Sequence, residues 1–114
     1  MPGRLCHGVI VDQGGAPPVF SASAEIDGDH LHVVVAGEVD MATADTMLQA
    51  ALREPAERIT LDLSAVTFFD SAAIHAVIRL AQQFPDRLTV LPSRQVRRVL
   101  DISGLSGQSW LKPA

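Results

Sequence analysis

The sequence has little cysteine, few aromatic residues and no long apolar run. Of its 114 residues one is cysteine (Cys6), none is tyrosine, and 4% are aromatic. A single cysteine excludes an intrachain disulfide and a cysteine-built zinc site. No apolar stretch approaches the roughly 20 residues of a membrane-spanning helix, and the N-terminal segment lacks the long apolar region of a signal peptide. We therefore expect a cytoplasmic protein.

Strong charge of either sign is also missing. The formal net charge is −4, and charged residues make up 19% of the chain. A nucleic-acid partner would call for a basic surface, so the charge gives no reason to expect one. Mild acidity is compatible with docking to a basic protein surface. The 47% of hydrophobic residues is enough for the core of one domain.

Glycine and proline divide the chain near its start. Gly14, Gly15, Pro17 and Pro18 interrupt both helix and strand, which predicts a flexible leader at residues 1–17 and a domain at residues 18–114. Within the leader, the short apolar stretch 9–11 is the one candidate for an added edge strand.

Hydrophobic periodicity predicts an α/β domain. Alternating and Val-rich segments predict strands at 20–26 and 31–36, joined as a hairpin by a turn at 27–29, and further strands at 58–63 and 88–91. Helical spacing predicts helices at 44–52, from 71 to about 84, and from Ser93 to Gly104. Asp40 or Thr43 is the expected cap of the first helix. The order β-β-α-β-α-β-α predicts helices packed on a small mixed β-sheet with parallel members.

The start of the second helix carries the most information. Asp70 and Ser71 are both residue types that cap helices, and that interpretation accounts for them without any function. The alternative is that Ser71 presents its hydroxyl at an exposed corner, where a kinase can phosphorylate it. Only His75, Arg79, Gln82 and Gln83 form a polar strip on this helix. Its wide apolar surface is either buried on two sides or partly reserved for a partner.

Several motifs in order resemble the STAS domain of anti-sigma factor antagonists, a bacterial family. The resemblance covers about residues 20–110 and rests on the segments 31–40 (LHVVVAGEVD), 43–48 (TADTML), 59–64 (ITLDLS), 66–71 (VTFFDS) and 99–105 (VLDISGL). It implies the family fold, a small mixed β-sheet with helices packed on one side.

The resemblance also implies a function without catalysis. In that family the serine after the aspartate is phosphorylated by an anti-sigma factor that is also an ATP-dependent serine kinase. The unphosphorylated antagonist sequesters this partner and frees the sigma factor for transcription, and a phosphatase restores it. The phosphoacceptor implied here is Ser71, and the implied partner-binding residues are Asp40, Asp70, Ser71, Ala72 and His75. The nucleotide belongs to the partner, so no cofactor is expected.

Three residues depart from the family pattern. The family reads Asp-Ser-Ser/Thr-Gly-hydrophobic-Gly, whereas this chain has Ala72, Ala73 and His75 at the last hydroxyl and the two glycines. These departures keep a second function open, a STAS scaffold that is not phosphorylated and serves in a larger complex such as a lipid-transport ATPase or a stress-signalling assembly.

Other functions have weaker support in the sequence. Ser71 and His75 lack the Gly-x-Ser-x-Gly elbow and the base geometry of a hydrolase. The other histidines (His7, His30 and His32) have no acidic or cysteine companions at metal-ligand spacing. No pocket signature supports a small-molecule-binding domain. Arg94, Arg97 and Arg98 form a basic helix face, which is either solvated or a docking rim for an acidic patch.

Overall fold

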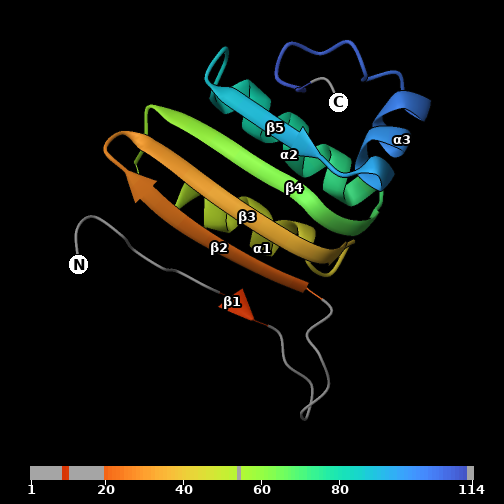
Figure 1. Cartoon of the computed structure of the whole chain (residues 1–114), viewed down its shortest axis with the longest axis horizontal. Helices are drawn as coiled ribbons and strands as arrows, with labels where there is room; N and C mark the ends of the chain where they lie inside the picture. The colour runs from red at the N-terminus through yellow and green to blue at the C-terminus, as the bar shows by residue number, and fades with distance from the viewer. Residues whose placement is uncertain (1–8, 11–19, 54, 113–114) are drawn as a thin grey trace.

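The fold is built on a mixed sheet whose strand order follows the sequence (Figure 1). The computed structural model describes residues 9–10, 20–53 and 55–112. Its elements are β1 (Val9–Ile10), β2 (Phe20–Asp27), β3 (His30–Val39), α1 (Ala44–Leu52), β4 (Arg58–Phe69), α2 (Ser71–Gln83), β5 (Leu88–Pro92) and α3 (Arg94–Ile102). The pairs β1–β2 and β2–β3 are antiparallel, whereas β3–β4 and β4–β5 are parallel.

The predicted hairpin is confirmed as β2 and β3. Alternate residues of β2 are buried, as the period-2 pattern requires. Gly28 lies in the turn at φ 64°, a left-handed backbone conformation that glycine adopts without a steric cost. β3 has β2 on one side and β4 on the other, so the Val-rich strand lies centrally in the sheet.

β4 is longer than predicted, because two bulges break its alternation. Its predicted end was residue 63, but the strand runs on to Phe69. Against β3 the register shifts between Val34 and Ala36 and again between Gly37 and Glu38, and β4 supplies the extra residue each time. Each inserted residue reverses the alternation of buried side chains, so the period-2 pattern disappears from the sequence. β3 likewise continues to Val39, past the break predicted at Gly37.

The helices cover one face of the sheet. In Figure 1, α1 and α2 lie behind the sheet, and α3 lies at the right of the view, next to the end of β5. Side chains from every helix join one hydrophobic cluster with the inward residues of β2 to β5, including Met47, Leu61, Leu80, Val90 and Leu100. This confirms the predicted small mixed β-sheet with helices packed on one side. None of the described helices lies on the opposite face of the sheet, and Val34 of β3 is exposed there.

The ends of the helices lie close to the predicted positions. α2 begins at Ser71 and ends at Gln83, and α3 is capped by Ser93 and followed by Gly104 at φ 79°. The predicted leader, residues 1–17, lies outside the described residues except for Val9–Ile10. These two residues form β1 on the edge beside β2.

Candidate docking surface

The predicted site lies where two parallel strands end side by side. β3 and β4 run in the same direction, so Asp40 and Asp70 follow them at the same edge of the sheet. The Asp70 backbone N–H donates to the Val39 carbonyl oxygen at 3.3 Å and joins the two loops. The structure therefore brings together Asp40, Asp70 and Ser71, which are separated by about thirty positions in the sequence.

Asp40 organises the loop that leads into α1. Its Oδ1 accepts the backbone N–H groups of Ala42 at 2.9 Å and Thr43 at 3.2 Å. In return, the Asp40 N–H donates to Thr43 Oγ1 at 2.9 Å, and the Thr43 hydroxyl donates to the Glu38 carbonyl at 3.0 Å. These hydrogen bonds pair the polar groups of the loop with one another, so they fix the conformation of the loop around Asp40.

Asp70 caps α2, and the Ser71 side chain that follows it takes no part in this cap. Its Oδ1 accepts the Ala73 backbone N–H at 3.1 Å, and its carbonyl accepts the N–H of Ile74 at 3.0 Å. Ser71 is the first residue of α2 and is exposed. Among the described residues, none forms a hydrogen bond with the Ser71 hydroxyl. The capping interpretation therefore holds for Asp70, whereas the Ser71 side chain is exposed and is not needed for the cap.

The three departures from the family pattern occupy different environments. Ala73 is fully buried in the core. Ala72 and His75 line a shallow groove of about 230 Å³ between α1 and α2, together with Met41 and other residues of both helices. Two of the predicted partner-binding side chains therefore face a groove that begins beside the corner.

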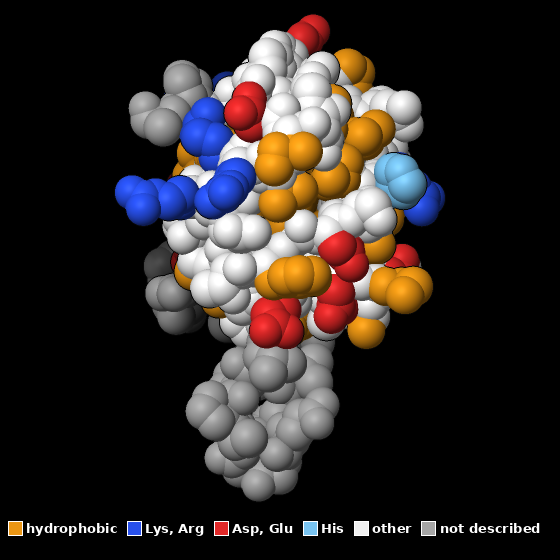
Figure 2. Space-filling view, turned by 90° about the vertical axis from the view of Figure 1, so that its right-hand side faces the viewer, with side chains coloured by type: hydrophobic (Ala, Val, Ile, Leu, Met, Phe, Trp, Pro, Cys, Tyr) orange, Lys and Arg blue, Asp and Glu red, His pale blue; other side chains and the backbone are white. Residues whose placement is uncertain are grey.

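Exposed apolar side chains at this edge were not identified from the sequence. Met41 is 82% exposed and Phe68 is 45% exposed, although both are large and hydrophobic. Figure 2 looks onto this edge and shows hydrophobic side chains lying between arginines and acidic residues. The exposure of one ring could have been predicted from the pair Phe68-Phe69. Successive strand residues face opposite ways, so only one of the two rings can be buried.

A pair of histidines lies away from this edge, on the face of the sheet without a described helix. His30 and His32 stack with ring centroids 4.1 Å apart, and His30 Nε2 lies 2.7 Å from Thr60 Oγ1. Desolvation lowers the pKa of His30, with the nearby His32 and Arg58 acting in the same direction. The part of the chain that the structure describes contains no group of three potential metal ligands.

A separate cleft lies between the C-terminal half of α2, β5 and the C-terminal tail. Its volume is about 570 Å³, and its lining includes Ile78, Phe84 and Trp110. This cleft was not predicted from the sequence, because its lining residues are scattered over more than thirty positions. Within the described ranges, no helix is long and apolar enough to cross a membrane.

Comparison with known proteins agrees with this arrangement. A family model described as "Mlab, STAS domain" matches residues 22–112. A search of curated proteins gives no match. The solved anti-sigma factor antagonist from Mycobacterium paratuberculosis is similar at 25% identity and TM-score 0.70, over 83% of this chain and 86% of that one.

Two further solved structures share the fold. The anti-sigma factor antagonist SpoIIAA in its unphosphorylated form is similar at 20% identity and TM-score 0.63, over 82% of this chain and 87% of that one. The STAS domain of an anti-sigma factor antagonist from Rhodobacter sphaeroides is similar at 19% identity and TM-score 0.53, over 68% of this chain and 91% of that one. By its family match over most of its length and by its fold, the chain belongs to the STAS domain family.

Proposed function

We propose that this protein is an anti-sigma factor antagonist that docks through the corner at Asp70-Ser71 and is released by phosphorylation of Ser71. In this proposal the partner is an anti-sigma factor with serine kinase activity, a phosphatase reverses the modification, and the cycle controls sigma-factor-dependent transcription in the cytoplasm. The observation that carries the proposal is the exposed Ser71 hydroxyl, free of described hydrogen bonds, at an edge with exposed apolar side chains.

The position of Ser71 suits a switch that leaves the fold intact. A phosphate at a helix N-terminus is compatible with the helix dipole and with the free N–H groups of the first turn. It adds a charge of roughly −1.5 to −2 beside Asp40 and Asp70. Desolvation and repulsion of about 3–4 kcal/mol at the interface would lower the affinity several hundredfold.

The direct test is phosphorylation by candidate partners. The protein is incubated with anti-sigma serine kinases and ATP, and mass spectrometry locates the modified residue. We expect one phosphate on Ser71, absent in Ser71→Ala and retained in Ser106→Ala, a matched change at an exposed serine of the C-terminal tail. Tight binding to a kinase without any modification of Ser71 would contradict the switch.

A second candidate function is a STAS scaffold that is not phosphorylated and serves as a subunit of a larger assembly, such as a lipid-transport ATPase. The observation in its favour is that His75 places an imidazole in the groove beside the corner, where the family pattern has glycine, and that Ala72 in the same groove lacks the hydroxyl of that pattern. Stable co-purification with a transport ATPase, unchanged by ATP and by Ser71→Ala, would favour the scaffold over the antagonist.

A further inference from the structure

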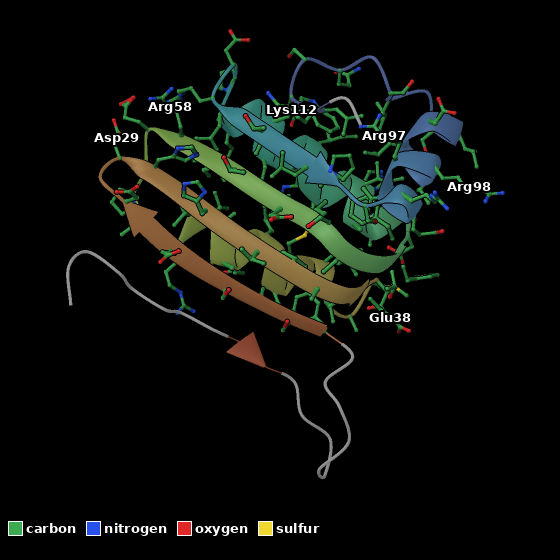
Figure 3. The ribbon with its side chains drawn as sticks, viewed as in Figure 1. Asp29, Glu38, Arg58, Arg97, Arg98 and Lys112 are labelled. Atoms are coloured by element: carbon green, nitrogen blue, oxygen red, sulfur yellow. The ribbon has the colours of Figure 1, made fainter. Side chains whose placement is uncertain are left out.

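One side of α3 presents a row of arginines at the same end of the molecule as the corner. Arg94 and Arg98 are exposed, and Arg97 is half-buried with its guanidinium donating to the Lys112 carbonyl oxygen. These arginines line a groove with Asp101 and Ser106. Figure 3 shows Arg97 and Arg98 at the same end of the molecule as Glu38, far from Arg58.

A short connection links this basic face to the docking edge. The Ser93 hydroxyl caps α3 by accepting the Val96 N–H at 3.1 Å and donates to the Val66 carbonyl of β4 at 2.7 Å. Phe68 lies two residues further along β4, between this anchor and the corner. Figure 2 shows arginines on one side of this surface with an acidic side chain next to them, hydrophobic side chains in the middle, and further acidic side chains below these.

The arginines are not neutralised within the described parts of the chain. Neither Arg94 nor Arg98 forms an ion pair with a described residue, and Asp101 forms none with them. Arg97 donates to a neutral carbonyl group. In a chain of net charge −4, this is a local reversal of sign beside an exposed apolar strip. Such a pattern suits a partner surface of opposite polarity, because complementary charges steer and orient association.

We infer that the docking surface continues from the corner across Phe68 onto α3, and that the partner carries an acidic strip that faces Arg94 and Arg98. This inference rests on the proposed function, because it describes the chemistry of the anti-sigma factor that docks at Ser71. The partner is then bound by three zones at this end of the molecule, namely the acidic corner, the exposed apolar side chains of Met41 and Phe68, and the basic face of α3.

A protein partner fits this surface better than an anionic membrane. The apolar side of α3 is fully committed to the core, since Val96 and Leu100 are both 0% exposed. Among the large hydrophobic residues of α3 only Ile102 is exposed to a substantial degree. A helix that lies on a membrane inserts a whole apolar face, and α3 has none to offer.

The test compares charge reversals at two ends of the molecule. Binding of the full chain to the anti-sigma serine kinase is measured by calorimetry at two salt concentrations for Arg98→Glu, Arg94→Glu and the control Arg58→Glu. The control makes the same change of net charge at the opposite end, on an exposed residue. We expect about tenfold weaker binding and a smaller salt dependence for each α3 variant, and little change for the control. Circular dichroism verifies that each variant is folded.

Ser71→Glu in the same series separates the inference from the proposed function. If Ser71→Glu abolishes binding while both α3 variants bind like the wild type, the inference is wrong and the proposed function stands. If no anti-sigma kinase binds the wild type, the proposed function fails, and the inference fails with it. Sedimentation with phosphatidylglycerol vesicles that is lost in Arg98→Glu would overturn the inference in favour of a membrane surface.

Discussion

The two helix starts at the docking edge look alike in sequence but use their polar groups differently. Each follows a parallel strand and contains an aspartate, Asp40 before α1 and Asp70 before α2. In the first loop the nearby hydroxyl of Thr43 is consumed, since it accepts from Asp40 and donates to Glu38. In the second, the Asp70 carboxylate makes the cap, and the hydroxyl of Ser71 has no described partner.

In the first loop the hydroxyl stabilises the loop itself, whereas in the second the hydroxyl is not needed for the described hydrogen bonds of the cap. A hydroxyl that holds its own loop together cannot be modified without breaking that loop. A hydroxyl that follows a capping aspartate is positioned by the helix at no structural cost. The first loop therefore suits shape recognition and the second suits regulation, although both lie on the same edge.

The largest expected effect is on partner binding at the second loop. Ser71→Glu should lower affinity for the anti-sigma kinase several hundredfold, the equivalent of about 3–4 kcal/mol, while the midpoint of thermal unfolding stays close to that of the wild type. Calorimetric titration and thermal unfolding measure the two quantities. Ser109→Glu, at an exposed serine beside the separate cleft at the C-terminal end of α2, is the matched control. Unchanged affinity of Ser71→Glu would remove Ser71 as the switch.

The next effect compares the two aspartates by stability. Asp40→Ala removes an acceptor of two backbone N–H groups and should lower the free energy of unfolding by about 2 kcal/mol. Asp70→Ala removes one capping bond and should lower it by about 1 kcal/mol. Urea unfolding of both variants gives the order. A larger loss at Asp70 would show that the second loop is the more structural of the two.

A smaller effect compares the two hydroxyls. Thr43→Ala loses two hydrogen bonds and should destabilise the fold by about 1 kcal/mol, whereas Thr43→Ser should retain most of them. Ser71→Ala should change the free energy of unfolding by less than about 0.5 kcal/mol, as is usual for exposed positions. Equal losses in Thr43→Ala and Ser71→Ala, measured by urea unfolding, would erase the distinction between the loops.

The smallest expected effect is on the pH dependence of stability, and it arises from His30, away from the docking edge. The pKa of His30 is lowered from its ordinary value of 6.5 in the folded protein, so the unfolded chain binds the proton more readily. The resulting stabilisation is complete above about pH 6.5 and is lost as the pH falls through the lowered pKa. His30→Gln should flatten the decline in thermal stability between pH 7 and pH 5. His75→Gln, an exposed control on α2, should retain the wild-type decline.

The elements that could be predicted from the sequence are those whose pattern is local. The helical spacing and the cap at Asp70 predicted α2 closely, and alternation predicted the β2–β3 hairpin. The continuation of β4 was missed because its two bulges reverse the alternation twice, leaving Val66 and Phe69 buried three positions apart. The predicted flexible leader lies outside the described residues and stays a prediction.

The candidate site was only partly predictable for a similar reason. Asp40, Asp70 and Ser71 were first identified as residue types that cap helices, and the resemblance then implied their roles in partner binding. The parallel pairing of β3 and β4 explains why they lie together. Phe68 and Met41 were missed because exposure of an apolar residue depends on tertiary packing rather than on local pattern. Whether any of these residues contacts a partner is a prediction for the binding experiments above.

The two bulges in β4 also bear on how this protein tolerates insertion and deletion. They set which of the adjacent rings, Phe68 or Phe69, faces the core and which is exposed at the edge. Since Thr67 is the extra residue of the second bulge, losing it would remove the bulge and leave Phe68 opposite Glu38 and Phe69 opposite Val39, each on its present face. An added residue outside a bulge would instead shift the register by one and exchange the two faces. The stretch therefore tolerates a deletion at the bulge better than an insertion beside it.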